Sequence, residues 1–341
     1  MIKRGYLNYI HTFRGLAIVG IVAIHCRVAF DWANQTHEYT VRLLFDNSTI
    51  LFVFIAGFLF EHLKHKYEYS SYLKRKAKYV IFPYIIVSIP PILDKLFISV
   101  EWSGSKLGGA LYYISSGKHF GPFWFIPMIA IFYLISPLLL RLNKDRFYQY
   151  IFPLIFIGGL FFYRFGYYST IGDSFLYFLP IYLLGMMASK YKNIIHQQRW
   201  LFSVPVLCLY WILLALEAYE VIPAPRLQSF HQAATDPWLL FNGAKLKMSV
   251  LCFVLMTFLY EFENRKIGLI NLLGDYSFGI YFLHLYFIIL SQHLVTNYFD
   301  GFTFNLITYA LYLMVITALS MLAVHLVKLL IGKRSRLLIG S

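Results

Sequence analysis

Long runs of apolar residues recur along the chain, and short polar segments separate them. An apolar run of about 20 residues is enough to cross the hydrocarbon core of a bilayer as a helix. Ten such runs lie at about 9–30, 43–62, 79–100, 123–140, 147–164, 174–189, 200–219, 245–261, 271–294 and 303–331. They predict an all-α polytopic membrane protein with about ten transmembrane helices in a single domain over residues 1–341. Pro90-Pro91 is expected to interrupt the third helix.

The basic residues indicate the orientation of these helices. If the N-terminus is cytoplasmic, 20 of the 30 Lys and Arg residues lie in segments that face the cytoplasm. Such an excess is typical of cytoplasmic loops in membrane proteins. The alternation holds for every inside loop and therefore predicts that both termini are cytoplasmic.

Composition supports the membrane class and excludes others. The chain is 59% hydrophobic and 13% charged, which is far more apolar than a soluble protein of this size. Its net charge of +14 follows the topology rather than a basic cluster, so no nucleic-acid partner is expected. Cys26, Cys208 and Cys252 lack CxxC spacing, and no His, Cys and Asp cluster has ligand spacing, so neither disulfides nor a metal are expected.

Two ionisable residues, Arg14 and His25, lie inside the first apolar run. Ionisable side chains are costly to place in a membrane and commonly mark functional sites. Eleven residues separate the two, which is close to three helical turns, so both side chains leave one face roughly 16 Å apart. This pairing favours a functional role for both.

Each of these residues also has a structural interpretation. Arg14 is a permanent cation, and either a phosphate of a cytoplasmic ligand or an acid on another helix would neutralise it. His25 is either a general base or a hydrogen-bonded core histidine. Asp31, Asp46 and Asp94, near the outer ends of spans, are candidate acidic partners for His25.

Two long segments are expected on the outer side, at 101–122 and 220–244. Loops of this length are either binding loops or plain connectors, and the sequence leaves both open. Trp102, Trp124 and Trp238 would suit stacking on sugar rings, although aromatic belts also place Trp at membrane interfaces.

Five motifs occur in order along nearly the whole chain. They are Phe13-Arg14-Gly15-Leu16-Ala17-Ile18 followed by His25, Leu51-Phe-Val-Phe-Ile-Ala-Gly-Phe-Leu59, Tyr72-Leu-Lys-Arg-Lys-Ala-Lys-Tyr-Val-Ile-Phe-Pro83, Phe123-Trp-Phe-Ile-Pro127 and Leu273-Gly-Asp-Tyr-Ser-Phe-Gly-Ile-Tyr-Phe-Leu-His284. Together they resemble the acyltransferase-3 family of integral membrane proteins. Ala56 stands where the family usually has Ser, Arg75-x-x-Lys78 replaces an Arg-x-x-Arg, and Asp275 replaces a residue that is often basic.

The resemblance implies a membrane O-acyltransferase of the bacterial cytoplasmic (inner) membrane. It would move an acyl group, with acetyl as the default, from cytoplasmic acyl-CoA to a hydroxyl of a cell-surface or secreted polysaccharide. The chain stops at Ser341 and is similar to stand-alone members that act on exopolysaccharides, so polysaccharide synthesis or export machinery is an expected partner. The alternative from another class is a transporter of polysaccharide or of a lipid-linked glycan.

Site residues follow from the same motifs. His25 would act as general base, and Arg14 is the second expected catalytic residue. Arg14, Arg75 and Lys78 would bind the anionic acyl-CoA. The remaining expected site residues are Trp124, Tyr281 and His284, which would contact substrate, although Tyr281 and His284 could equally pack and hydrogen-bond or orient His25.

Overall fold

The computed structural model describes residues 6–164, 169–222, 241–265, 267–299 and 301–341. Over these ranges the chain is helical and forms no strand beyond an isolated bridge between Trp32 and Phe304. The α-helices are α1 (Asn8–Cys26), α2 (Gln35–Phe45), α3 (Thr49–His62), α4 (Tyr69–Lys76), α5 (Phe82–Leu93), α6 (Lys106–Ser116), α7 (Phe125–Leu134), α8 (Ser136–Leu142), α9 (Phe152–Leu160), α10 (Ile171–Lys190), α11 (Lys192–Gln197), α12 (Arg199–Ala218), α14 (Gly243–Tyr260), α15 (Gly268–Tyr298), α16 (Leu306–Ile331) and α17 (Ser335–Leu338). The predicted all-α class is confirmed.

The helices correspond to the predicted membrane spans. Eight helical segments of the described chain are long and apolar enough to cross a membrane. A bent pair, Gly121–Leu134 with Ser136–Leu142, makes up to nine, and Phe147–Leu160 is a shorter apolar helix. Each of the ten apolar runs is therefore helical over most of its length, and the protein is a multi-pass membrane protein. The cytoplasmic placement of the termini stays a prediction.

Proline does not interrupt the third span, contrary to expectation. The helical run continues from Tyr69 to Ile98. Two π turns, η2 (Ala77–Ile81) and η3 (Asp94–Ile98), flank the proline-containing helix α5. The turn η2 precedes Pro83, and a π turn there widens the helix and relieves the clash between the proline ring and the preceding carbonyls. A third π turn, η5 (Phe147–Ile151), precedes Pro153 in the same way.

The fourth and fifth spans differ from the prediction more than the third span does. The fourth bends by 59° between α7 and α8, where Ser136-Pro137 opens the second helix. Proline has no N–H to continue the helical hydrogen bonds, and its ring clashes with the carbonyl four residues earlier, which explains a break here. The fifth span ends at Leu160 instead of 164, directly after Gly158-Gly159. Arg164 is consequently outside the helix that was expected to contain it.

The first outer segment is not a loop throughout. Helix α6 occupies its centre, with the Ser105 hydroxyl accepting from the backbone N–H of Gly108 at 3.1 Å. Gly117 ends the helix with a φ of 69°, the left-handed conformation that glycine adopts readily. In the second outer segment, residues 223–240 with Trp238 lie outside the described residues.

The second span consists of two helices, α2 and α3, with a break at residues 46–48. Asn47 has a φ of 63°, in the left-handed region where a non-glycine residue is uncommon. Irregular backbone at membrane depth is tolerated where it lines a cavity or is buried in protein. The break is therefore a feature that points to a site.

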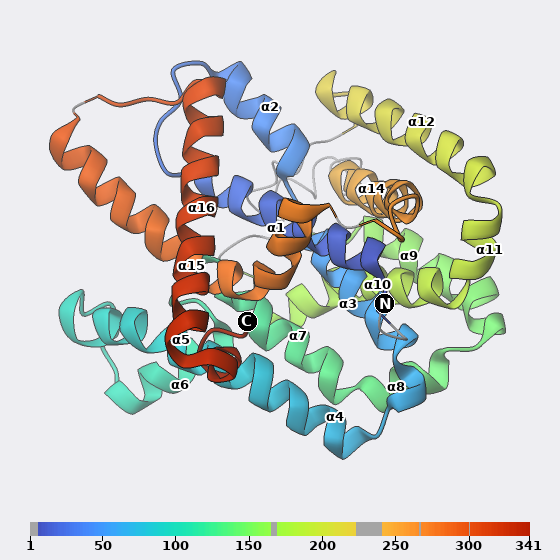
Figure 1. The fold of residues 1–341 in the computed structure, drawn as a ribbon, viewed down its shortest axis with the longest axis horizontal. Helices are drawn as coiled ribbons and strands as arrows, with labels where there is room; N and C mark the ends of the chain where they lie inside the picture. The colour runs from blue at the N-terminus through green and yellow to red at the C-terminus, as the bar shows by residue number, and fades with distance from the viewer. Residues whose placement is uncertain (1–5, 165–168, 223–240, 266, 300) are drawn as a thin grey trace.

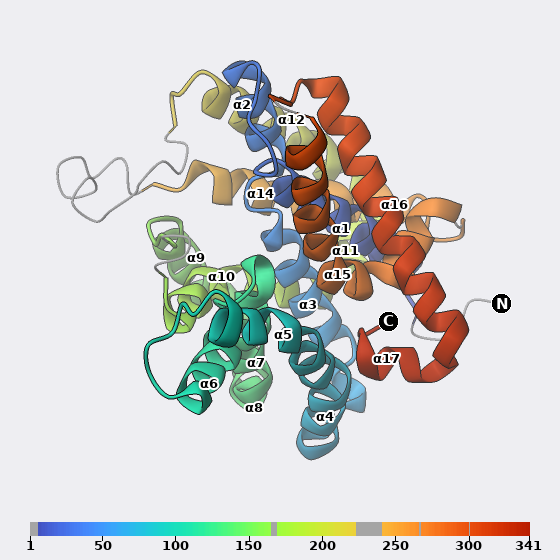
Figure 2. The same ribbon diagram turned by 90° about the vertical axis from the view of Figure 1, so that its left-hand side faces the viewer.

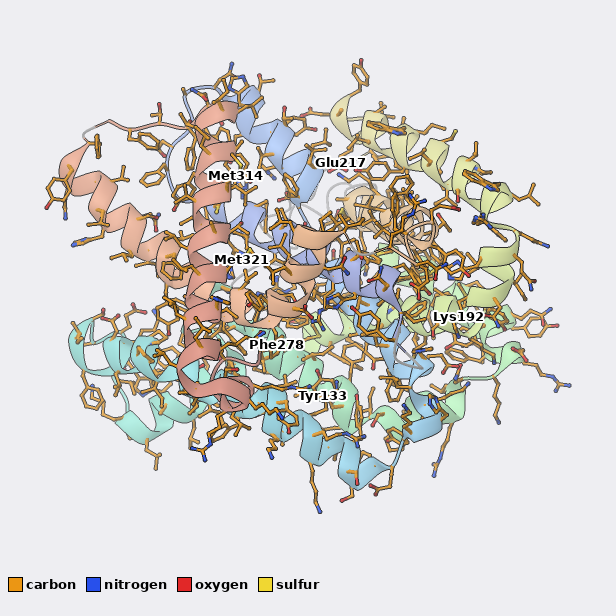
Figure 3. The ribbon with its side chains drawn as sticks, viewed as in Figure 1. Tyr133, Lys192, Glu217, Phe278, Met314 and Met321 are labelled. Atoms are coloured by element: carbon orange, nitrogen blue, oxygen red, sulfur yellow. The ribbon has the colours of Figure 1, made fainter. Side chains whose placement is uncertain are left out.

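Helix α1 lies at the centre of the bundle, with α15, α14, α3 and α16 packed around it (Figure 1). Close contact with α15 depends on Gly15, where a Cβ would overlap the carbonyl oxygen of Ile270. Helix α16 runs along the edge of the molecule (Figure 2), and Met314 on it is 58% exposed (Figure 3). Such an apolar outer face suits contact with lipid.

Helices α3 and α10 pack about as closely as α1 and α15 do. A Cβ at Gly57 would overlap the carbonyl oxygen of Tyr182, and one at Gly185 would overlap that of Phe54. The two glycines thus allow each helix backbone to lie against the other. Closely packed small residues are a common way to join membrane helices.

The loops that are expected on the cytoplasmic side contact one another at one end of the bundle. The Asn8 amide donates to the carbonyl of Phe262 at 2.9 Å, and Lys190 pairs with Asp145 at 2.9 Å. At the opposite end, the Tyr39 hydroxyl donates to the carbonyl of Glu217 at 2.7 Å. The structure is therefore consistent with the alternation that the basic residues predict.

Candidate active site

His25 lies one residue before the end of α1, where its ring meets His284 of α15. Nδ1 of His25 is 3.3 Å from Nε2 of His284 and 2.7 Å from the carbonyl oxygen of Ile21. Nδ1 of His284 is 3.0 Å from the carbonyl oxygen of Ile280. His284 is fully buried, whereas His25 is partly accessible.

These contacts assign the protons of both rings. A carbonyl oxygen only accepts hydrogen bonds, so Nδ1 of His25 and Nδ1 of His284 each carry hydrogen. Nε2 of His284 is then the acceptor that faces Nδ1–H of His25. Nε2 of His25 is left unprotonated and has no hydrogen-bond partner among the described residues. An oriented imidazole with one open nitrogen is the arrangement that a general base requires.

A cavity of about 230 Å³ adjoins His25. Aromatic side chains form much of its wall. Trp124 stacks on Phe178 with ring centroids 5.8 Å apart, and Tyr281 donates its hydroxyl to the carbonyl of Pro122 at 2.7 Å. Phe278 of α15, labelled in Figure 3, lines the cavity as well. Trp124 and Tyr281, both expected near substrate, thus lie at the same cavity as His25.

Part of the cavity wall is polar. The break between α2 and α3 contributes Asn47 and Ser48, and the start of α3 contributes Thr49. The Tyr177 hydroxyl donates to Oδ1 of Asn47 at 3.2 Å and accepts from Nδ2 of Asn242 at 3.3 Å. Aromatic faces combined with a few fixed amides and hydroxyls are common in sites that bind polar small molecules such as sugars. The sequence signal for this wall was the polar triplet Asp46-Asn47-Ser48 inside an apolar run.

Arg164 lines the same cavity and was missed in the sequence. Its guanidinium carbon is 3.5 Å from the ring centroid of Trp124, and its Nε donates to the Ser174 hydroxyl at 3.0 Å. The chain leaves α9 at Leu160, which allows Arg164 to turn towards the cavity. An arginine at the end of an apolar run was the available signal, by the same reasoning that singled out Arg14.

Arg14 lies on the same face of α1 as His25, because both side chains reach α15. Its Nε donates to the carbonyl oxygen of Gly274 at 3.0 Å, and Nη2 donates to the same oxygen. In the described part of the chain no carboxylate lies within ion-pair distance of Arg14. Asp275 pairs with His11 instead, at 3.2 Å. Arg14 does not line the cavity, and about 16 Å along the helix axis separates it from His25.

Arg75 and Lys78 lie at the end of the bundle where Arg14 is found. Both are exposed, in α4 and the π turn η2. Nζ of Lys78 is 5.4 Å and the guanidinium carbon of Arg336 is 4.3 Å from the centroid of the Tyr79 ring. The C-terminal residues therefore add positive charge to this surface. Arg75 and Lys78 are not at the cavity, so the predicted site residues fall into two groups at different depths.

The three candidate acidic partners of His25 have other contacts. Asp46 lies 3.5 Å from Nε of Arg42, Asp94 accepts from the Ser99 hydroxyl at 2.9 Å, and the Asp31 carbonyl accepts from the backbone of Phe304. His284, rather than a carboxylate, faces Nδ1 of His25. Among the residues that the structure describes, no group of three or more His, Cys, Asp or Glu side chains could hold a metal ion.

Comparison with known proteins identifies the family. The acyltransferase domain model of the acyltransferase-3 family matches residues 7–325, which is nearly the whole chain. No curated protein and no solved structure was found to match it. The match includes α1 to α15 and most of α16, and so every residue that lines the cavity. The chain therefore belongs to the acyltransferase-3 family, and it is a membrane acyltransferase.

Proposed function

We propose that this acyltransferase moves an acyl group, with acetyl as the default, from cytoplasmic acyl-CoA to a hydroxyl of a cell-surface or secreted polysaccharide. The observation that carries the proposal is the open Nε2 of His25 beside a cavity with aromatic and polar walls. A sugar hydroxyl is a poor nucleophile at neutral pH, and a positioned base removes this limitation.

In the proposed reaction, the acceptor hydroxyl attacks the thioester carbonyl while Nε2 of His25 takes its proton. The carbon–sulfur bond then breaks, and the thiolate of CoA leaves with the proton that His25 returns. Nε2 of His284 accepts the hydrogen bond from Nδ1–H of His25, which stabilises the imidazolium during the step. Direct transfer needs no covalent acyl-enzyme intermediate, although a histidine can form one.

The donor would bind at the other end of α1. Acyl-CoA is highly anionic, and Arg14, Arg75, Lys78 and Arg336 gather positive charge there. The pantetheine arm would bridge the distance of about 16 Å from Arg14 to His25. The acceptor would then receive the acyl group without the whole donor crossing the membrane.

The setting follows from the same proposal. The protein would lie in the bacterial cytoplasmic (inner) membrane, in contact with the lipid bilayer and with polysaccharide synthesis or export machinery. Family membership supports an enzyme over the transporter alternative. The donor supplies the acyl group and the acceptor supplies the hydroxyl. The proposed reaction therefore requires neither a metal nor a further cofactor.

The test compares cells that carry wild type or His25→Ala at equal membrane expression, with His293→Ala as a matched control because His293 is exposed on α15. The acyl content and the amount of secreted glycan are measured. We expect His25→Ala to export glycan without acyl groups and His293→Ala to match wild type. Glycan lost from the surface at an unchanged acylation ratio would indicate a transporter instead.

A further inference from the structure

The guanidinium of Arg164 presents an unused pair of hydrogen-bond donors at the cavity. Its face is stacked on Trp124 and its Nε is bonded to Ser174. Neither Nη atom has a hydrogen-bond partner among the described residues. Arg14 differs, because its Nε and Nη2 both donate to one carbonyl oxygen. Arg164 is held by its face and Nε, while the end that matches a carboxylate stays open.

No acidic side chain in the described chain offsets this charge. The described residues that line the cavity include neither Asp nor Glu. Asp46, at the nearby break, is next to Arg42, and Glu217 pairs with Lys247 at 2.7 Å. An arginine in a membrane protein that lacks a counter-ion is costly to retain.

A second basic side chain lies close to the cavity. Lys245 is fully buried, with Nζ 2.6 Å from the carbonyl oxygen of Gly159 and 4.0 Å from the ring centroid of Tyr177. Tyr177 lines the cavity, so Lys245 lies directly behind its wall. Both basic side chains are thus on the side of the cavity that α9, α10 and α14 form.

We infer that the reaction places a carboxylate in this cavity, bound by the two Nη groups of Arg164. The inference rests on the proposed transfer at His25 and adds the class of substrate. Two sources would supply the carboxylate: a dicarboxylic acyl group such as succinyl on the donor, or an acidic sugar in the acceptor. The open guanidinium, the aromatic stack and the absence of a lining acid are the same for both.

The experiment uses membranes that contain the full-length protein. The acceptor glycan is purified from cells that lack this protein. One arm compares succinyl-CoA with acetyl-CoA as donor. The other compares native glycan with glycan whose carboxyl groups have been reduced to alcohols. The variants are Arg164→Gln, Arg164→Lys, which keeps the charge if Gln impairs folding, and Arg146→Gln, which removes an exposed arginine elsewhere.

We expect wild type and Arg146→Gln to prefer the carboxylate-bearing substrate at least tenfold in one of the two arms. Arg164→Gln should lose that preference, and Arg164→Lys should keep part of it. The inference is wrong if wild type transfers acyl groups with neither preference. It is also wrong if Arg164→Gln lowers all rates equally and keeps the preference, which would indicate stabilisation of the oxyanion or of the fold. Failure of wild type to acylate any glycan would instead refute the proposed function.

Discussion

The hydrogen bond between His25 and His284 allows a quantitative prediction for the replacement of His284. Leucine at this position would remove one of the two acceptors of Nδ1–H of His25 and leave the carbonyl oxygen of Ile21 as the other. Glutamine would keep an acceptor, because its amide oxygen can take the place of the imidazole nitrogen. His284 is fully buried and does not line the cavity, so neither change alters the surface that substrates touch.

The magnitude follows from the charge that His25 acquires during transfer. A hydrogen bond to a charged group contributes about 1.5–3 kcal/mol. At about 1.4 kcal/mol per tenfold change, the loss of this bond should lower kcat by roughly 10-fold to 150-fold in His284→Leu. KM for acyl-CoA should stay close to wild type, because the donor contacts lie about 16 Å away along α1. His284→Gln should recover a substantial part of kcat.

The assay is steady-state transfer from radiolabelled acetyl-CoA to purified glycan in membranes with equal amounts of protein. Thermal unfolding of each solubilised variant shows whether the fold is retained. A folded His284→Leu protein with the kcat of wild type would refute the assigned role of His284. Equal losses in His284→Leu and His284→Gln would show that packing, rather than the hydrogen bond, is what the histidine supplies.

Two further predictions concern packing and pH. A valine at Gly15 would overlap the carbonyl oxygen of Ile270, so it should destabilise the protein by about 1–3 kcal/mol in thermal unfolding, and Gly158→Val, which meets open space, is the control. Burial, with Lys192 and Arg199 nearby, lowers the pKa of His196 to about 4, while its unfolded pKa is about 6.5. The unfolded chain binds more protons in that window, so stability should fall by up to about 3 kcal/mol as pH drops from 6.5 to 4. The melting temperature of His196→Gln should depend less on pH there, and an equal dependence would contradict the assignment.

Much of the fold could be predicted because the length of an apolar run decides whether a helix can span a bilayer. Two differences from the predicted spans involve proline. Pro90-Pro91 is accommodated in a continuous helix, whereas Ser136-Pro137 marks a bend of 59°. Both prolines lie in apolar runs, so the local sequence alone does not distinguish these two outcomes.

The site was predictable in part for a similar reason. Helical periodicity alone placed Arg14 and His25 on one face, and both indeed contact α15. The proton assignment of His25 depends on the register between α1 and α15, which no local pattern indicates. Arg164 was missed because the predicted helix extended past Leu160 and enclosed it. A stretch of apolar residues does not show where a helix ends when no proline or polar residue marks the end.

The reciprocal contacts of Gly57 and Gly185 have a consequence for how the enzyme can move. Two backbone-to-backbone contacts leave α3 and α10 little freedom to slide or rotate against each other, so they should behave as one rigid body. Asn47, next to the start of α3, and Tyr177 on α10 are hydrogen-bonded at the cavity and belong to that body. The polar wall would keep its shape through a catalytic cycle. Any rearrangement that accompanies arrival or departure of the donor would then fall to the helices around it, with the acceptor side already preorganised.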